Sequence, residues 1–206
     1  MGADKAFLKF GNTTLLERAV GIAKLTADAV YICGPREKFG PEAIEDIFPD
    51  CGPLGGIHAA LKSSQSELNL VLAVDLPFVE ADFLKYLLCK TEINPDSLSD
   101  NRETGVRSFT MPLRTENREL RTSALTAVVP RAARGWQPLC ALYRKAFAET
   151  AEKALREKRY KIDSLFDEVP VRPVEEVEIL QAGFSLRIFD NLNTPQDFNL
   201  AQQRLP

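Results

Sequence analysis

A glycine turn and an aspartate at the end of an apolar run have the residue types and spacing of a ligand site. The turn is Gly-Pro-Leu-Gly-Gly at residues 52–56, and Asp75 follows the apolar residues 70–74. Glycine lets a backbone approach a flat or phosphorylated ligand closely, and a helix that begins in such a turn offers free N–H groups to an anion. Open α/β sheets bind ligands just beyond the carboxyl ends of their strands, where Asp75 would lie. The pair therefore predicts a site for a nucleotide and a metal ion.

Each half of this pattern has a simpler explanation when it is taken alone. Glycine- and proline-rich runs are common in ordinary loops, and an aspartate after a strand commonly caps a helix. The order and spacing of the two features together favour the ligand site. His58 is the only histidine in the sequence, so a histidine-based triad or a multi-histidine metal site is excluded. We interpret His58 and Trp136 as structural residues.

The elements that must position these residues alternate between helices and strands. Thr14 and Glu17 form a capping-box pattern that predicts a helix over residues 15–25. Thr194 before Pro195 predicts the start of a terminal helix. This alternation predicts parallel strands with helices on both faces. The other predicted elements are a helical turn or loop over 42–48, strands over 29–33, 70–74, 124–129, 139–143, 175–180 and 186–189, and helices over 57–64, 81–90, 146–158 and 164–168.

Length and composition predict one domain, residues 1–206, with a flexible insertion over residues 94–122. A chain of 206 residues with 45% hydrophobic residues can bury a sizeable core. Residues 94–122 are rich in charged and polar residues and have few apolar ones, so they cannot offset the entropy of becoming ordered. A role for this insertion as a lid or partner-binding loop is the alternative.

Charge and cysteine content exclude several classes of protein. The formal net charge of −3 argues against a general nucleic-acid surface. The 4 cysteines are far apart and form no Cys-x-x-Cys pair, so we expect no structural zinc site or disulfide framework. We see no signal peptide and no apolar run of membrane-spanning length. We therefore expect a soluble, cytoplasmic protein that binds neither nucleic acid nor membrane.

Four segments resemble the molybdenum cofactor guanylyltransferase family, in the family's order. They are the glycine turn with Asp75, an early Asp-Lys-Ala segment at residues 4–6 with the helix start at 15–18, the run Gln-Pro-Leu-Cys-Ala-Leu-Tyr at 137–143, and Asn-Leu-Asn-Thr-Pro at 191–195. The resemblance implies a three-layer α/β/α fold with a mostly parallel, Rossmann-like sheet of the nucleotide-diphospho-sugar transferase type.

The resemblance also implies a reaction and its participants. The protein would transfer GMP from GTP to molybdopterin and release pyrophosphate, with Mg²⁺ as cofactor. Its partners would be GTP and the molybdopterin cofactor, and molybdoenzyme maturation proteins are a further alternative. Two other functions stay open, a non-catalytic relative that binds molybdopterin or a maturation partner, and a relative that transfers a cytidylyl group.

Site residues are carried over from the family onto matching positions of this sequence. Lys5 and Asp75 would be the catalytic residues, with Asp75 as the metal ligand. Asn191 and Asn193 would contact molybdopterin or a second metal ion. The GTP-binding residues would be Lys5, Asp46, Gly52, Pro53, Leu54, Gly55, Gly56 and Asp75. A carboxylate at Asp46 can accept hydrogen bonds from the N–H edge of guanine, which favours GTP over CTP.

The sequence departs from the family at its start. Family members open with a buried strand and a glycine-rich phosphate loop, and this sequence begins at the tail of that loop. We expect either that Met1 is an internal methionine or that the chain is a shortened relative. Because the first strand of such a sheet is central, two neighbouring strands should have unpaired N–H and C=O groups. A chain that starts at Met1 should therefore be poorly stable or should bind something in that gap.

Overall fold

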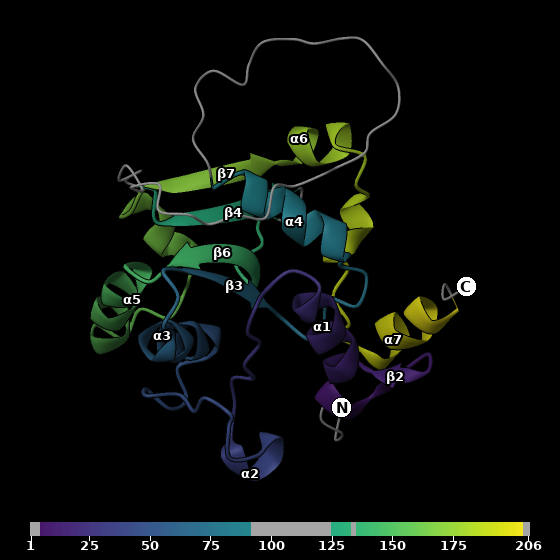
Figure 1. Cartoon of the computed structure of the whole chain (residues 1–206), viewed down its shortest axis with the longest axis horizontal. Coiled ribbons are helices and arrows are strands. Elements are labelled where there is room, and N and C mark those ends of the chain that lie inside the picture. The colour runs from purple at the N-terminus through teal and green to yellow at the C-terminus, as the bar shows by residue number, and fades with distance from the viewer. Residues whose placement is uncertain (1–4, 92–124, 133–134, 204–206) are drawn as a thin grey trace.

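A five-stranded sheet forms the middle layer of the protein (Figure 1). The computed structural model describes residues 5–91, 125–132 and 135–203, so the predicted insertion at 94–122 lies outside the described residues. The sheet has the strand order β3-β6-β4-β5, and β7 also pairs with β4. Its strands are β3 (Leu68–Leu72), β4 (Ala127–Ala132), β5 (Gly135–Trp136), β6 (Cys140–Arg144) and β7 (Val171–Glu175).

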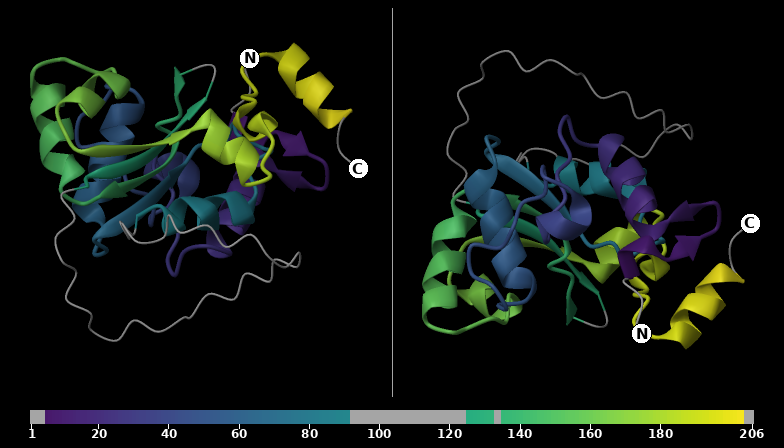
Figure 2. Two further views of the ribbon diagram at one scale, coloured as in Figure 1. Left: turned by 90° about the horizontal axis from the view of Figure 1, so that it is seen from above. Right: turned by 90° about the horizontal axis from the view of Figure 1, so that it is seen from below.

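Alternate side chains of the central strands enter two different apolar layers. Ala141 and Tyr143 of β6 pack in a cluster with α3 (Pro53–Ser63) and α5 (Phe147–Arg156). Leu142 of β6, which points to the opposite face, packs with α4 (Ala81–Cys89) and α6 (Glu176–Gln181). Figure 2 shows these helix pairs on opposite sides of the sheet. The α/β class and the helices on both faces are as predicted.

The predicted parallel order is not confirmed among the described strand pairs. β3 pairs with β6, β6 with β4, and β4 with β5, all antiparallel. Only β4 and β7 run parallel. β7 itself was not predicted, because its residues precede the strand expected over 175–180. The sheet described here is therefore mainly antiparallel.

The predicted strand over residues 29–33 is wrong, because these residues form only one isolated bridge. Cys33 bridges Ile44 in parallel, where the Ile44 N–H donates to the Ile32 carbonyl at 2.9 Å. A strand needs a partner along its length. β3 lines the same cavity as residues 29–33 but does not pair with them. Residues 42–48 contain no helix, so the loop alternative holds there.

Three later predictions also differ from the structure. Residues 175–180 are not a strand, because Glu175 caps α6 through a reciprocal capping box with Glu178. Residues 186–189 form the 3₁₀-helix η3 (Leu186–Phe189), capped by the Ser185 side chain. The short helix predicted over 164–168 is also a 3₁₀-helix, η2 (Asp163–Asp167).

The two ends of the described chain meet at one side of the sheet (Figure 1). Phe10 and Leu15 pack against Leu192 and Ala201 in a separate apolar cluster. Thr14 caps α1 (Leu15–Lys24) and Thr194 caps α7 (Pro195–Gln202), both through capping boxes, which confirms these two predicted helices. The remaining elements are η1 (Lys5–Phe7), β1 (Lys9–Phe10), β2 (Thr13–Thr14) and α2 (Arg36–Phe39). Within the described residues, no helix has the length and apolar character needed to cross a membrane.

Candidate active site

Lys5 and Asn193 come together although 188 positions separate them in the chain. The Lys5 ammonium donates to Asn193 Oδ1 at 3.1 Å. Asn193 is held in place by the end of α7, because its N–H and that of Thr194 both donate to Asp197 Oδ2, at 3.2 and 2.8 Å. Asp197 is thus a positioning residue that the sequence revealed only as part of a helix cap.

Asp75 lies next to this pair through a backbone contact. Its carbonyl accepts a hydrogen bond from the N–H of Leu192 at 3.0 Å. Because Leu192 stands between Asn191 and Asn193, this bond places both asparagines beside the residues that follow β3. The structure therefore brings Lys5, Asp75, Asn191 and Asn193 into one neighbourhood.

The glycine turn is the first turn of α3 rather than a loop before it. The helix predicted from residue 57 begins at Pro53, with Gly52 as its N-cap at φ +64°. Proline favours the first helical position because its fixed φ suits a helix and its missing N–H needs no partner there. Gly55 and Gly56 consequently lie inside the helix, and Leu54 packs in the core with no exposed surface. Leu54 can contribute only backbone atoms to a ligand.

The carboxylate of Asp46 lies over this first turn. A β-carbon added at Gly55 would stand 3.2 Å from Asp46 Oδ2 and 3.0 Å from the Phe48 carbonyl oxygen, and one added at Gly56 would stand 3.6 Å from Asp46 Oδ1. Glycine at position 55 therefore permits the close approach. The helix N-terminus attracts negative charge, while loss of hydration raises the pKa of Asp46.

One cavity of about 1020 Å³ joins the two groups. Lys5 and Asp75 border it, and so do Pro53 and Gly56 of the glycine turn. Asp46, Gly52, Leu54 and Gly55 do not line this cavity, so the turn faces it with part of its surface only. A ligand that contacts both groups would lie along this border.

One family model and several relatives match this chain. The MobA-like NTP transferase domain matches residues 1–171. The chain belongs to this family. A probable molybdenum cofactor guanylyltransferase from Clostridium perfringens strain 13 is 27% identical over 95% of this chain and 85% of its own length. One from Methanosarcina mazei is 30% identical over 94% of this chain and 80% of its own length. Members of this family are nucleotidyltransferases, and this protein is one of them.

Solved structures share its fold. Molybdopterin-guanine dinucleotide biosynthesis protein A from Archaeoglobus fulgidus matches with a TM-score of 0.74, covering 98% of this chain and 90% of its own at 22% identity. The 2-C-methyl-D-erythritol 4-phosphate cytidylyltransferase from Thermus thermophilus matches with a TM-score of 0.61, covering 97% and 92% at 18% identity. The nucleotide-diphospho-sugar transferase type of fold is confirmed, and it is common to enzymes that differ in their base.

This MobA-like protein offers few ligands for a metal ion. Among the described residues, no three His, Cys, Asp or Glu side chains lie together in a way that could hold one. Mg²⁺ commonly needs only one or two protein oxygens, because waters and substrate phosphates complete its shell. Asn191 Oδ1 is buried and has no hydrogen-bond partner within the described residues, so this oxygen is available to accept a hydrogen bond or to coordinate an ion. Asp75, whose carbonyl accepts from the neighbouring Leu192 N–H, and Asn191 are therefore the candidate protein oxygens for such an ion.

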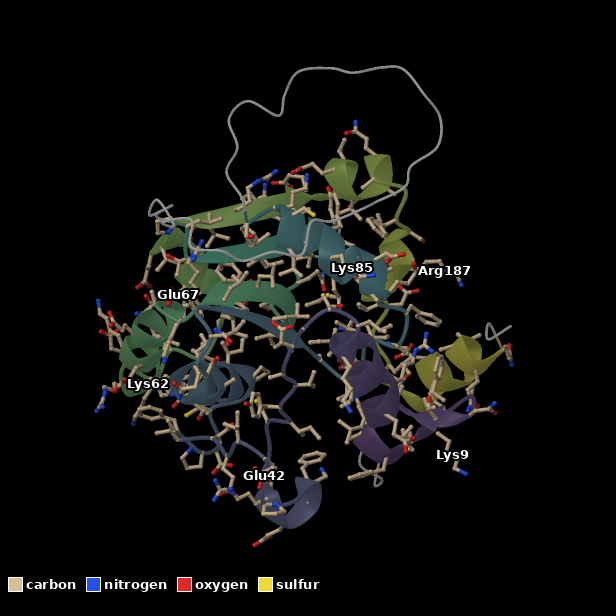
Figure 3. All side chains as sticks on the ribbon, in the orientation of Figure 1. Lys9, Glu42, Lys62, Glu67, Lys85 and Arg187 are labelled. Atoms are coloured by element: carbon tan, nitrogen blue, oxygen red, sulfur yellow. The ribbon has the colours of Figure 1, made fainter. Side chains whose placement is uncertain are left out.

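His58 lies outside the cavity and is buried beside α5. Its ring is 1% exposed and meets Phe48 edge-on, with ring centroids 5.3 Å apart. Its Nε2 is 3.6 Å from Glu152 Oε2, which also accepts a hydrogen bond from Lys62 at 3.2 Å. Figure 3 labels Lys62 at this outer edge of α3. Burial lowers the pKa of His58, which favours the neutral form of the ring.

Proposed function

We propose that this protein transfers GMP from GTP to molybdopterin and releases pyrophosphate. The observation that carries the proposal is the contact of Lys5 with Asn193 beside Asp75, on the border of a cavity that the glycine turn also reaches. A cationic side chain, a carboxylate and close-approach glycines are the groups that nucleotidyl transfer requires. The names of the relatives supply the substrates.

Charge is the main barrier to this reaction. An oxygen of the molybdopterin phosphate would attack the α-phosphate of GTP in line, with pyrophosphate as the leaving group, and both reactants are anionic. Lys5 would place a compact positive charge on the triphosphate. Asn193 would hold the Lys5 ammonium in position through the hydrogen bond to Oδ1. Positioning and charge neutralisation together would lower the barrier.

A divalent ion would be held by Asp75, with Asn191 Oδ1 as a second oxygen. When bound, Mg²⁺ would withdraw negative charge from the phosphates. The Asp75 carbonyl accepts a hydrogen bond from the Leu192 N–H, so the backbone that carries the carboxylate would be held in place before substrates arrive.

The base would be selected at the first turn of α3. The Asp46 carboxylate would accept hydrogen bonds from the N–H groups on the edge of guanine. Gly55 and Gly56 would let the base lie close to the backbone, because neither carries a side chain. The Asp46 carboxylate already lies close to both glycines. Because cytidylyltransferases share this fold, the choice of guanine depends on this carboxylate.

Binding of a fluorescent GTP analogue with Mg²⁺, together with pyrophosphate release, tests the proposal. Lys5→Ala and Asp75→Asn should each weaken binding at least about tenfold, equal to about 1.4 kcal/mol. Lys9→Ala is the matched control, since Lys9 is exposed on β1 away from the cavity, and it should change binding less than about twofold. Pyrophosphate should appear only when GTP and molybdopterin are both present. Faster release from CTP than from GTP would contradict the proposal.

A further inference from the structure

Phe48 anchors the coil that carries Asp46. Of residues 45–50, only Phe48 is partly buried, and the other five are exposed. The Phe48 side chain packs against the apolar cluster that α3 and α5 share. Figure 1 shows the coil leading into α3 from below. Because burial of an aromatic ring is a large stabilising contribution, the position of this coil depends on where the Phe48 ring lies.

Two side chains from different helices hold the Phe48 ring. The His58 ring of α3 meets it edge-on, with centroids 5.3 Å apart and planes at 67°. The Arg156 guanidinium of α5 lies over the ring, 5.7 Å from its centroid, where the ring quadrupole attracts a cation. His58 is buried, and neither of its ring nitrogens has a hydrogen-bond partner in the described part of the chain. His58 therefore supports Phe48 by packing.

Glu152 keeps Arg156 in this position. The Arg156 guanidinium donates to Glu152 Oε1 through Nη2 at 2.6 Å and through Nε at 3.2 Å. The other oxygen of this carboxylate accepts from Lys62 of α3 at 3.2 Å. The planar guanidinium is thus oriented by hydrogen bonds while its face is free to stack on a ring. We call Phe48, His58, Arg156 and Glu152 together the Phe48 clamp.

The clamp lies beside the groups that would read a base. The Phe48 carbonyl oxygen is 3.0 Å, and Asp46 Oδ2 is 3.2 Å, from the place of a β-carbon on Gly55. His58 belongs to the same helix as Gly55 and Gly56, so α3 carries both the glycines and the support for Phe48. The ring contacts therefore fix the spacing between the Asp46 carboxylate and the backbone of α3.

We propose that Phe48 is a positioning residue for base recognition, which holds the Asp46 carboxylate at the spacing that suits the N–H edge of guanine. The inference rests on the proposed function, in which Asp46 accepts hydrogen bonds from guanine. Hydrogen bonds weaken steeply when their geometry is poor, so a carboxylate on a loose, exposed coil would discriminate little between bases. The clamp makes the carboxylate selective because it fixes the position of Asp46 before the base arrives.

The ratio of the dissociation constants for ITP and GTP measures this positioning. ITP has the N1–H of guanine but lacks its 2-amino group, so the two nucleotides differ in a donor that the carboxylate would accept from. With Mg²⁺ and the full chain, ITP should bind at least about tenfold more weakly than GTP, and Phe48→Ala should reduce this ratio to about two or less. Ile47→Ala is the matched control, since Ile47 is 56% exposed on the same coil, and it should leave the ratio unchanged. Partial unfolding would weaken both nucleotides equally and would not change the ratio.

Further variants show whether the ring acts through the carboxylate. Phe48→Leu keeps an apolar side chain but loses the ring, so it should reduce the ratio at least about threefold even if Phe48→Ala does not fold. Phe48→Tyr keeps the ring and should retain the ratio. Phe48→Leu combined with Asp46→Ala should give the same ratio as Asp46→Ala alone. A further loss in the double variant would mean that Phe48 acts by another route, which overturns the inference.

The outcomes separate this inference from the proposed function. If Asp46→Ala abolishes the preference for GTP while Phe48→Ala and Phe48→Leu retain it, the inference is overturned and base selection by Asp46 stands. If Ile47→Ala reduces the ratio as much as Phe48→Ala does, the ring has no special role, and the inference is again overturned. If Asp46→Ala leaves the ratio unchanged, base selection by Asp46 fails together with the inference, and pyrophosphate release still tests the transfer reaction.

Discussion

β3 and β6 are neighbours in one sheet, yet their side chains differ in burial. Every residue of β3 is half-buried, whereas Cys140, Ala141, Leu142 and Tyr143 of β6 are fully buried. β6 has a strand on each side, and β3 has one on one side only. Both strands are apolar in sequence, so the difference comes from their neighbours. An apolar strand is fully buried only when neighbouring elements cover both of its edges and both of its faces.

The helices repeat this contrast. α5 buries Phe147, Ala148, Ala151, Ala154 and Leu155, and α1, of equal length, buries Leu15 alone. α5 packs against α3 and the sheet, while the apolar side of α1 borders the cavity of about 1020 Å³. An amphipathic sequence thus specifies which side of a helix is to be buried, and the partner decides whether that burial is achieved.

The largest expected effect compares Leu142 with Leu70, which are directly opposed across β6 and β3. Leu142→Ala should lower the free energy of unfolding by about 3 kcal/mol, because it leaves a cavity in a closed core. Leu70→Ala should lower it by only about 1 kcal/mol, since its side chain is already partly hydrated. Urea titration with a constant m-value measures both changes. Equal losses of the free energy of unfolding for Leu70→Ala and Leu142→Ala would show that β3 is as closed as β6, contrary to the structure.

A second comparison sets Gly55 of α3 against Gly21 of α1. Gly55→Ala should lower the free energy of unfolding by about 1–3 kcal/mol, because a β-carbon would come within 3.0 Å of the Phe48 carbonyl oxygen. Gly21→Ala meets no atom within 4 Å and should raise it by up to about 1 kcal/mol through helix propensity. Thermal and urea unfolding measure both, and a stabilising Gly55→Ala would place Asp46 and Phe48 farther from α3 than the structure has them.

Local signals in the sequence predicted the elements that depend on local contacts. The starts of α1 and α7 are fixed by hydrogen bonds between residues close together in the chain, Thr14 with Glu17 and Thr194 with Asp197. Both helices are present. The strand predicted over 175–180 failed although the sequence held a competing signal of the same kind. Glu175 and Glu178 form a capping box, which starts a helix where the strand was predicted. Residues 29–33 failed for another reason, since strand formation depends on partners elsewhere in the chain.

The candidate site was predictable only in part. The resemblance named Lys5, Asp75 and Asn193, but no spacing rule connects residues that lie 188 positions apart. The approach of Asp46 to Gly55 is likewise a tertiary contact. The position of Asp75 beyond β3 followed from the strand prediction, because it depends on one short apolar run. The residue types therefore suggested a chemistry, and the fold was needed to show which of these residues meet.

The last expected effect concerns pH and the face of the sheet that α3 and α5 cover. His58 is buried and neutral there, and burial lowers its pKa from 6.5. The unfolded chain therefore takes up a proton near pH 6.5 that the folded chain takes up only at a lower pH. The free energy of unfolding should be unaffected above that pH and should fall as the pH drops from 6.5 toward 5, by at most about 1.4 kcal/mol per pH unit. Urea titrations at pH 7.5, 6.5, 5.5 and 5.0 measure it.

His58→Gln separates this effect from those of the surrounding charges. The groups that face the ring are Glu152, Lys62 and Arg156. Hydrogen bonds from Arg156 and Lys62 lower the pKa of Glu152 to about 2, so its contribution is lost only below pH 4.5, outside this range. His58→Gln should make stability nearly constant between pH 7.5 and 5.0, even if the variant is less stable throughout. If the stability of the variant still fell with pH, the pH dependence would come from carboxylates elsewhere. His58 would then not be its source.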